Sequence, residues 1–405
     1  MNLPKLPSKC VECIIKHIDE NDIKTLHSTT LVNRDWCKFS VIRLWKTPLS
    51  FSNLISNLNS NSKLESKSNS INSTTNLTKY PFNNFYKIIP ILLSFLDVNF
   101  QKDLNNLSKQ FYIPKNTLNF YPKLQYDLKI PIDDLKIPTH TILSFDYPKY
   151  IKHVNFVDLV VLANKWLNNL LSETLSSSSI FLNFYLYKSL GRWDYIRYMT
   201  NSINFHCPFI HFDKNPQIFF KFILESLFKV LFNYSQINSL SIMDVSVTHH
   251  PCNQLNRLDH NHFLSNLTSF SFCQTIDSGL LKKISGLIHD TITTISISIV
   301  SDESFVDVID FINSLHSLQS ISILGNNTNV TSIIQSLQNH TSTLIKLKLN
   351  LCIIDDDAIE SLSECDHLQE LIFHQLHFTF DDEIDNISMN YLYFPQLKKL
   401  NYWEY

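Results

Sequence analysis

The chain of 405 residues carries 34 Lys and Arg against 37 Asp and Glu, and its net charge of -3 provides no strong field for phosphates or anionic membranes. A hydrophobic content of 44%, with 29 Phe and 16 Tyr, excludes global disorder and indicates a packed interior. The length suits two or three domains or one elongated repeat array. Neither nucleic acid nor a membrane is an expected partner.

The sequence gives no sign of secretion or of a membrane anchor. The first residues, MNLPKLPSK, are not followed by the apolar segment and cleavage site of a secretory signal. The densest apolar run, Ile88 to Leu96, has about half the length needed to cross a bilayer, and Pro90 interrupts it. The eight Cys are irregularly spaced, which indicates reduced core residues. We therefore expect a soluble protein of the cytoplasm, the nucleus or both.

The chain has four glycines, at 191, 279, 286 and 325. Loops that cradle phosphates need closely spaced Gly where the backbone approaches the ligand or takes a positive φ. No such cluster exists, which excludes kinases, P-loop NTPases and ordinary Rossmann enzymes.

Three short helices are predicted within residues 6–45, as part of a module spanning 1–50. Ser8 and Asp22 are predicted N-caps of the first two helices. The first helix is expected to place one set of apolar residues on one face: Cys10, Val11, Ile14, Ile15 and Ile18. The second helix would carry Ile23 and Leu26, and the third Val32, Trp36, Phe39 and Leu44.

A module of about forty residues buries too little surface to hide all its apolar side chains. Those left exposed would mark a partner surface, with Trp and large aliphatic residues as anchors. The alternative is a helical hairpin that packs on the rest of the chain as its cap. After the module, residues 51–80 are mostly Ser and Asn and read as a flexible linker, and residues 81–147 read as a helical connector.

The remainder, 148–405, repeats one apolar pattern, most clearly over 237–405. Starts of successive copies are about 24 to 30 residues apart, close to the range of leucine-rich repeats. The copies are Ile237, Leu240, Ile242; Leu267, Phe270, Phe272; Ile292, Ile295, Ile297; Leu318, Ile321, Ile323; Leu344, Leu347, Leu349; Leu368, Leu371, Phe373; and Leu397, Leu400, Tyr402. An earlier copy is predicted at Ile151, Val154 and Phe156.

Amphipathic helices are expected between these strands, at 279–288, 304–315, 330–337 and 356–362. A unit of one strand and one helix cannot bury its apolar face alone, so neighbouring units stack. The predicted fold class is α/β: a small three-helix module, a connector, and a solenoid with a curved parallel sheet and outer helices. A TIM barrel or a doubly wound sheet is the alternative, which the even spacing and the scarcity of Gly disfavour.

The N-terminal segment resembles the F-box, the module that binds the Skp-family adaptor of cullin-RING ubiquitin ligases. The matching positions are Leu6, Pro7, Cys10, Val11, Ile14, Ile15, Asp22, Ile23, Val32, Trp36, Leu44 and Trp45, while Lys9 replaces the usual acidic residue. The resemblance implies contact with a Skp-family adaptor, and through it a cullin, by Leu6, Pro7, Val11, Ile14, Ile15, Ile18, Ile23, Leu26, Val32, Trp36, Leu44 and Trp45.

The C-terminal region resembles the leucine-rich repeats found with F-boxes, because Cys352 follows Leu347 and Leu349 at the turn position of the Cys variant. Together the modules look like a substrate-recruiting subunit from large fungal families, not an enzyme, and without a cofactor. Its target would bind the concave face, where the side chains between the buried triplets point, or the loops that rim this face. These side chains include Ser269, Ser271, Thr294, Ser296, Ser320, Ser322, Lys346, Lys348, Asn350, Glu370, His374, Lys399 and Asn401. A repeat scaffold without ligase recruitment is the alternative.

Other candidate sites have ordinary structural interpretations. Cys10 and Cys13 form a C-x-x-C without a second pair, so we expect them in the core. The group His249, His250, Cys252, His260 and His262 matches no zinc module, and no metal is predicted there. The acidic runs 355–357 and 381–383 suit helix capping better than cation binding. An enzyme hidden between 82 and 234 is a remaining alternative.

Overall fold

The computed structural model places two compact units, Met1–Gln236 and Ile237–Tyr405, which are described separately. The predicted linker at 51–80 and most of the connector at 81–147 lie outside the described residues. The described residues are 6–19, 22–46, 88–96, 112–113, 128–129, 145–160, 162–163, 166, 215–243, 261–301, 304–379 and 394–403.

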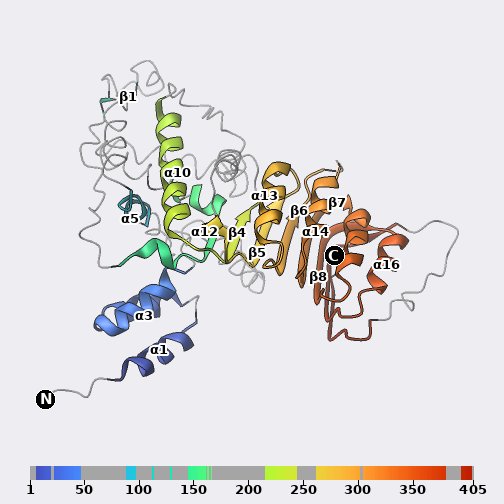
Figure 1. The fold of residues 1–405 in the computed structure, drawn as a ribbon, viewed down its shortest axis with the longest axis horizontal. Coiled ribbons are helices and arrows are strands. Elements are labelled where there is room, and N and C mark those ends of the chain that lie inside the picture. The colour runs from blue at the N-terminus through green and yellow to red at the C-terminus, as the bar shows by residue number, and fades with distance from the viewer. Residues whose placement is uncertain are drawn as a thin grey trace, which may run out of the picture. The chain divides into compact units, whose positions relative to one another are not determined.

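The first unit begins with the three predicted helices, α1 (Ser8–His17), α2 (Ile23–Thr30) and α3 (Arg34–Leu44), drawn in blue in Figure 1. Asp22 caps α2 as predicted, since its carboxylate accepts a hydrogen bond from the Thr25 amide at 3.0 Å. Asn33 caps α3 in the same way. The prediction for Ser8 is wrong: Pro7 occupies the N-cap position and its carbonyl accepts the first helical bonds, so Ser8 is already helical.

These three helices, residues 6–46, form what we call the N-terminal module, and it has its own core. Val11, Ile15 and Leu26 are each 1% exposed. The partly buried residues that pack around them are Ile18, Trp36, Phe39 and Leu44. The module is therefore closed around a small centre of its own.

Further elements of the first unit are short, apart from one long helix. They are α5 (Ile88–Leu93), β1 (Tyr112–Ile113), antiparallel to β2 (Leu128–Lys129), the 3-10 helix η5 (Tyr147–Tyr150), β3 (His153–Asn155) and α10 (Asn215–Tyr234). Ile151, Val154 and Phe156, predicted as a first repeat strand, are buried around β3. The Phe156 ring meets Phe228 of α10 at 4.8 Å.

The N-terminal module is joined to η5 by its last residues. The Trp45 and Tyr147 rings lie 4.4 Å apart. The Lys46 carbonyl accepts hydrogen bonds from the amides of Lys152 at 2.9 Å and His153 at 3.2 Å. These contacts attach the end of α3 to η5 and to the residues at the start of β3. None of them involves α1 or α2.

The second unit is built on a parallel sheet in which strands follow one another in chain order. Its strands are β4 (Ser239–Ile242), β5 (Ser269–Cys273), β6 (Thr294–Ser298), β7 (Ser320–Asn329), β8 (Lys346–Ile354), β9 (Glu370–His374) and β11 (Lys399–Trp403). A short strand, β10 (His377–Phe378), pairs with the end of β8.

Strand register confirms the predicted repeats. The middle residue of each apolar triplet pairs with the middle residue of the next, in the row Leu240, Phe270, Ile295, Ile321, Leu347, Leu371 and Leu400. All members of this row except Leu400 are at most 1% exposed. Side chains alternate across a strand, so an in-register stack puts every triplet on the same face.

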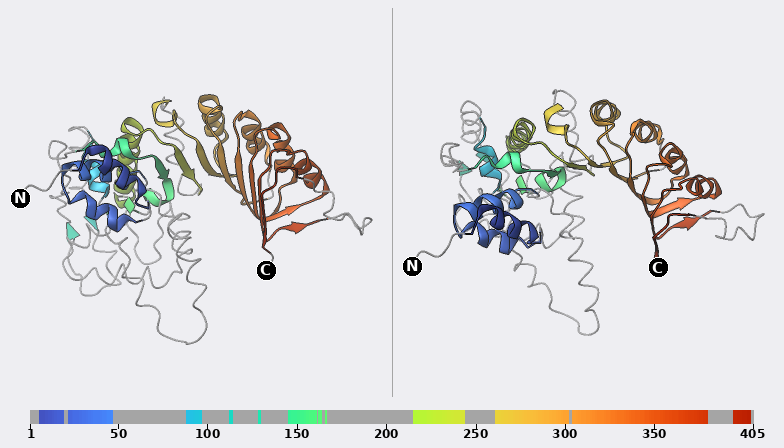
Figure 2. Two further views of the ribbon diagram at one scale, coloured as in Figure 1. Left: turned by 90° about the horizontal axis from the view of Figure 1, so that it is seen from below. Right: turned by 60° about the horizontal axis from the view of Figure 1, so that its bottom comes forward.

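Helices cover that face. They are α12 (Asn261–Leu264), α13 (Ser278–Ile288), α14 (Val306–Ser314), α15 (Thr331–Gln335) with the 3-10 helix η6 (Ser336–His340), and α16 (Asp356–Ser363). The four predicted helices correspond to α13, α14, α15 with η6, and α16. Figure 2 shows these helices on the outer side of the curved strands of this unit. Helices on one face, with strands in chain order, are consistent with a repeat solenoid and not with a doubly wound sheet.

The last triplet differs from its prediction. Leu400 is 59% exposed and Tyr402 is 43% exposed, whereas the earlier triplets are buried. Among the described residues, the helices α12 to α16 all precede β9 in the chain, and none follows it beside β11.

The pairing of β7 with β8 shifts register between Leu324 and Thr328. A Cβ on Gly325, in this irregular part of β7, would lie 2.7 Å from Cys352 Sγ and from the Leu351 carbonyl oxygen. Residues on both strands take positive φ here: Asn326 at 50° and Asn327 at 63° in β7, and Leu351 at 52° in β8. Gly325 is therefore needed for close approach of two repeats.

We predict that Gly325→Ala lowers the free energy of unfolding by roughly 1–3 kcal/mol, because the added methyl group overpacks β7 against Cys352 of β8. Gly286→Ala in α13 is the matched control: its added Cβ would meet nothing within 4 Å, and Ala favours a helix by about 1 kcal/mol over Gly. Urea unfolding of the full chain measures both. Equal stability of the two variants would contradict the close approach.

Candidate functional site

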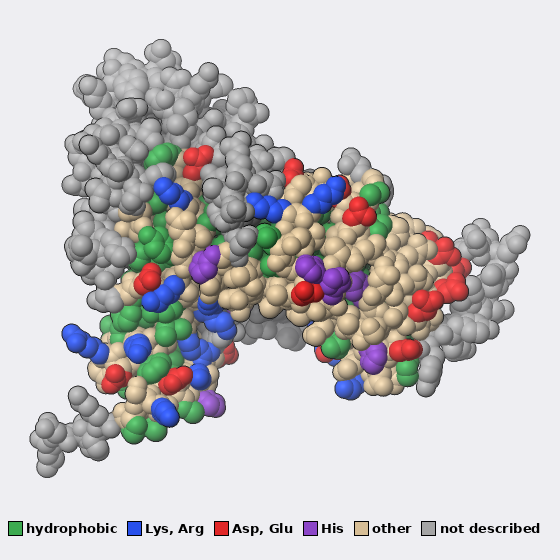
Figure 3. Space-filling model, viewed as in Figure 1, with side chains coloured by type: hydrophobic (Ala, Val, Ile, Leu, Met, Phe, Trp, Pro, Cys, Tyr) green, Lys and Arg blue, Asp and Glu red, His purple; other side chains and the backbone are tan. Residues whose placement is uncertain are grey.

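The N-terminal module leaves large apolar side chains on its surface. Leu31 is 76% exposed and Val32 is 59% exposed, and both lie in the turn between α2 and α3. Leu6, Ile14 and Ile42 are also exposed. Figure 3 shows hydrophobic side chains, in green, over this part of the molecule. The module thus buries one apolar set and presents another.

The predicted adaptor-binding residues include both exposed and buried side chains of the module. Leu6, Pro7, Ile14 and Val32 are exposed. Val11, Ile15 and Leu26 lie in the core, so we assign them to holding the module together and not to direct contact. The half-buried members are Ile18, Trp36, Leu44 and Trp45, and the side chain of Ile23 lies outside the described residues.

Sequence periodicity missed Leu31 and Ile42 as surface residues. Leu31 follows the end of α2 and lies outside any helical stripe, so periodicity could not assign it. The sequence feature that indicates an exposed Leu31 is the Leu-Val pair directly before the N-cap Asn33, because a turn between two helices leaves such side chains at the surface.

The predicted apolar face of α1 needs correction. Val11, Ile15 and Ile18 face the core, whereas Cys10, Cys13 and Ile14 are exposed. Spacings of four and three residues from Val11 to Ile18 define a narrow stripe, and Cys10, Cys13 and Ile14 fall beside it. The expectation that Cys10 and Cys13 lie in the core is therefore wrong.

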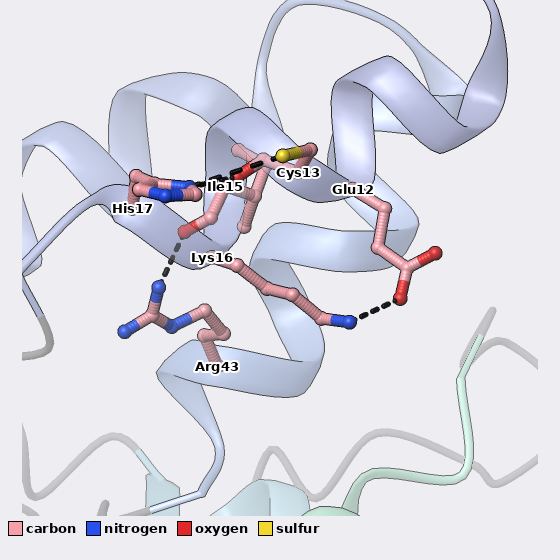
Figure 4. Close-up of polar contacts among 6 residues, drawn as sticks. All are labelled: Glu12, Cys13, Ile15, Lys16, His17 and Arg43. Atoms are coloured by element: carbon pink, nitrogen blue, oxygen red, sulfur yellow. Dashed lines mark hydrogen bonds and ion pairs between the residues drawn. The ribbon is translucent and has the colours of Figure 1, made fainter.

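Polar contacts fix the module's helices against one another. The Arg43 guanidinium on α3 donates to the Ile15 carbonyl near the end of α1 (Figure 4). Thr29 of α2 and the buried Ser40 of α3 share a hydrogen bond of 2.6 Å between their hydroxyl oxygens. Both contacts join α3 to another helix, so the exposed apolar residues lie on a fixed framework.

An ion pair lies along the surface of α1. Lys16 and Glu12, four residues apart, are separated by 2.8 Å and both are exposed (Figure 4). The hydrogen bond from Lys16 lowers the pKa of Glu12. Pairs of this kind contribute little to stability in water.

The inner face of the second unit carries the predicted target-binding side chains in two rows. The first row is Ser269, Thr294, Ser320, Lys346, Glu370 and Lys399, and the second is Ser271, Ser296, Ser322, Lys348, Ile372 and Asn401. Asn350 pairs with His374 in a third row, two residues farther along strands β8 and β9. These residues are at least partly exposed, as the alternation of buried and exposed positions requires.

The inner face changes character along the stack. From β5 to β7 its two rows hold only Ser and Thr, and from β8 to β11 they gain Lys and Glu. Lys346 pairs with Glu370 at 2.6 Å and lowers the pKa of that carboxyl by its hydrogen bond. Burial, and then Lys348, lowers the pKa of His374. Lys348 and Lys399 make this end of the inner face basic.

Several of the other candidates have structural roles. Asp355 caps α16 by accepting the Ala358 amide at 3.2 Å, as predicted for the 355–357 run. Of the His-rich group, His262 is described and lies exposed on α12, whereas His249, His250, Cys252 and His260 lie outside the described residues. The acidic run at 381–383 lies outside them too.

The chain matches no protein-family model, and none of the curated proteins resembles it in sequence at a significant level. Among the described residues, no helix has the length and apolar character needed to span a bilayer.

Buried thiols provide a test of the second unit's packing. Burial raises the pKa of Cys352 and that of Cys365 to about 11, while Cys10 and Cys13 are exposed. At pH 8 about one Cys352 in a thousand would be ionised, so iodoacetamide should label Cys10 and Cys13 but leave Cys352 and Cys365 unlabelled until the chain unfolds. Peptide mass spectrometry after timed labelling measures this.

The same shift has a consequence for stability. An unfolded Cys ionises near its ordinary pKa of 9.0, so the contribution of Cys352 and Cys365 is complete below pH 9 and is lost as the pH rises toward 11. Labelling of Cys352 at pH 8 as fast as Cys10 would contradict this packing.

Proposed function

We propose that this chain is a substrate-recruiting adaptor of a cullin-RING ubiquitin ligase, with an F-box at its N-terminus and leucine-rich repeats after it. The observation that carries the proposal is the exposure of Ile14, Leu31 and Val32 on a module that already has a closed core. Exposed aliphatic side chains on a module of this size favour a protein partner.

The identity of that partner comes from the sequence resemblance. The Leu-Pro opening at Leu6 and Pro7, the capped second helix, and the Val32 and Trp36 pair are the F-box features of the module. They favour a Skp-family adaptor, and through it a cullin. Leu6, Ile14, Leu31 and Val32 would contact the adaptor, while Val11, Ile15 and Leu26 would keep these residues in position.

The repeats would bind the target through the basic end of their inner face. Lys348, Asn350, Lys399 and Asn401 offer hydrogen-bond donors on this face. Together with His374 they suit a folded or peptide target, cytoplasmic or nuclear. The adaptor would act by proximity, since holding the target near the ubiquitin-charged enzyme raises its effective concentration.

We predict that Leu31→Asp combined with Val32→Asp weakens binding of the purified full chain to a Skp-family adaptor at least about tenfold, because charged groups replace the apolar contact. Calorimetric titration measures the affinity. The matched control is Val300→Asp with Val306→Asp, which changes two exposed valines of the second unit and should leave the affinity unchanged.

Thermal unfolding of these variants should match the parent chain, because the altered side chains are exposed. Unchanged affinity of the Leu31→Asp, Val32→Asp variant would refute the assigned surface. If the parent chain itself fails to bind the adaptor, the scaffold without ligase recruitment is the correct function.

A second prediction concerns the target. Affinity purification from cells with mass spectrometry should recover the same target with the full chain and with a chain lacking residues 1–50, but cullin and adaptor with the full chain only. Lys348→Glu with Lys399→Glu should lose the target, because the basic end of the inner face is inverted. Lys282→Glu on α13, an exposed lysine on the outer side, is the control and should retain it.

A further inference from the structure

Three metal-ligating side chains converge in the second unit at the turns that lead into β6 and β7. His289 and Asp290 follow the end of α13, and His316 follows the end of α14. Each offers one atom that could bind a metal ion, and these three atoms lie within 4.8 Å of one another. His289 Nε2 is 3.3 Å from Asp290 Oδ2, and His316 Nδ1 is 2.8 Å from Asp290 Oδ1.

The stacking of repeats produces this cluster. Ile295 pairs with Ile321, an offset of 26 residues, and the same offset relates Asp290 to His316. The two residues therefore occupy equivalent positions of neighbouring repeats.

The backbone beneath the cluster is fixed by hydrogen bonds. The His316 amide donates to the His289 carbonyl at 3.1 Å. The Thr291 hydroxyl, next to Asp290, donates to the Leu267 carbonyl at 2.8 Å. The two turns are thus held together before any ligand arrives, and only the three side chains need to adjust.

We propose that His289, Asp290 and His316 bind a divalent late first-row metal ion, with Zn²⁺ as the best match. Two imidazoles and one carboxylate suit this class, whereas Mg²⁺ and Ca²⁺ require oxygen ligands throughout. Donor atoms around one tetrahedral Zn²⁺ lie about 3.3 Å apart. The corresponding distances here are 3.3 Å from His289 Nε2 to Asp290 Oδ2 and 2.8 Å from His316 Nδ1 to Asp290 Oδ1, and all three ligand atoms lie within 4.8 Å of one another.

Three protein ligands leave a tetrahedral ion one open position. The cluster is on the surface, with side-chain exposure of 40% for His289, 68% for Asp290 and 64% for His316. Water, or a donor atom from a bound protein, would take the fourth position. Figure 3 shows His side chains, in purple, gathered beside acidic ones on the visible face of this unit. The ion would also join two repeats, since His289 and His316 belong to different ones.

Calorimetric titration of the untagged full chain with Zn²⁺ tests this site. The parent chain should bind one equivalent more than the His289→Ala, His316→Ala variant, and Asp290→Asn should weaken that equivalent at least about tenfold. His367→Ala is the matched control, because His367 is an exposed histidine that follows Asp366. It should retain full stoichiometry.

A second measurement guards against effects on folding. Zn²⁺ should raise the melting temperature of the parent chain more than that of the double variant, because the ion binds the folded stack, and Mg²⁺ should raise neither. Equal Zn²⁺ stoichiometry, affinity and melting shift in the parent chain and the double variant would overturn the proposal and leave the cluster as a hydrogen-bonded ion pair.

Discussion

In-register pairing of parallel strands is the constraint on which the second unit depends. Each strand hydrogen-bonds to the next with its apolar triplet aligned, so the row from Leu240 to Leu371 faces one way throughout. A slip by one residue at any strand would turn its triplet toward solvent and its polar residues toward the helices. Burial of these triplets, at roughly 1.5–3 kcal/mol for each large side chain, is therefore secured jointly by neighbouring repeats.

The same alignment creates the surfaces that could bind partners. On the inner face it forms rows of Ser and Thr that end in Lys346, Lys348 and Lys399. At the turns before the strands it brings Asp290 beside His316. Close stacking also explains why β7 needs glycine where it approaches β8, since a side chain at Gly325 would meet Cys352. Packing and surface chemistry thus follow from one geometric rule.

The N-terminal module follows a different constraint, which is its size. Its three helices enclose only a small core, and the Arg43 and Thr29 contacts hold them around it. Leu31 and Val32 remain outside because no further helix of the module is present to cover the α2–α3 turn. A small module with a rigid arrangement of helices cannot bury all its apolar side chains. The exposed ones make it suitable for binding a partner.

The sequence by itself determined the local elements: the apolar triplets, the helices between them, and the Asp22 and Asp355 caps. Each depends on residues a few positions apart, which local hydrogen bonding and periodicity can specify. The tertiary structure alone decided which side of α1 is buried, because α3 packs against Val11 and Ile15 and leaves Cys10 and Ile14 in solvent. It alone brought His289 and Asp290 close to His316, because only the stacking of two repeats brings together residues that are 26 positions apart in the chain, as Asp290 and His316 are.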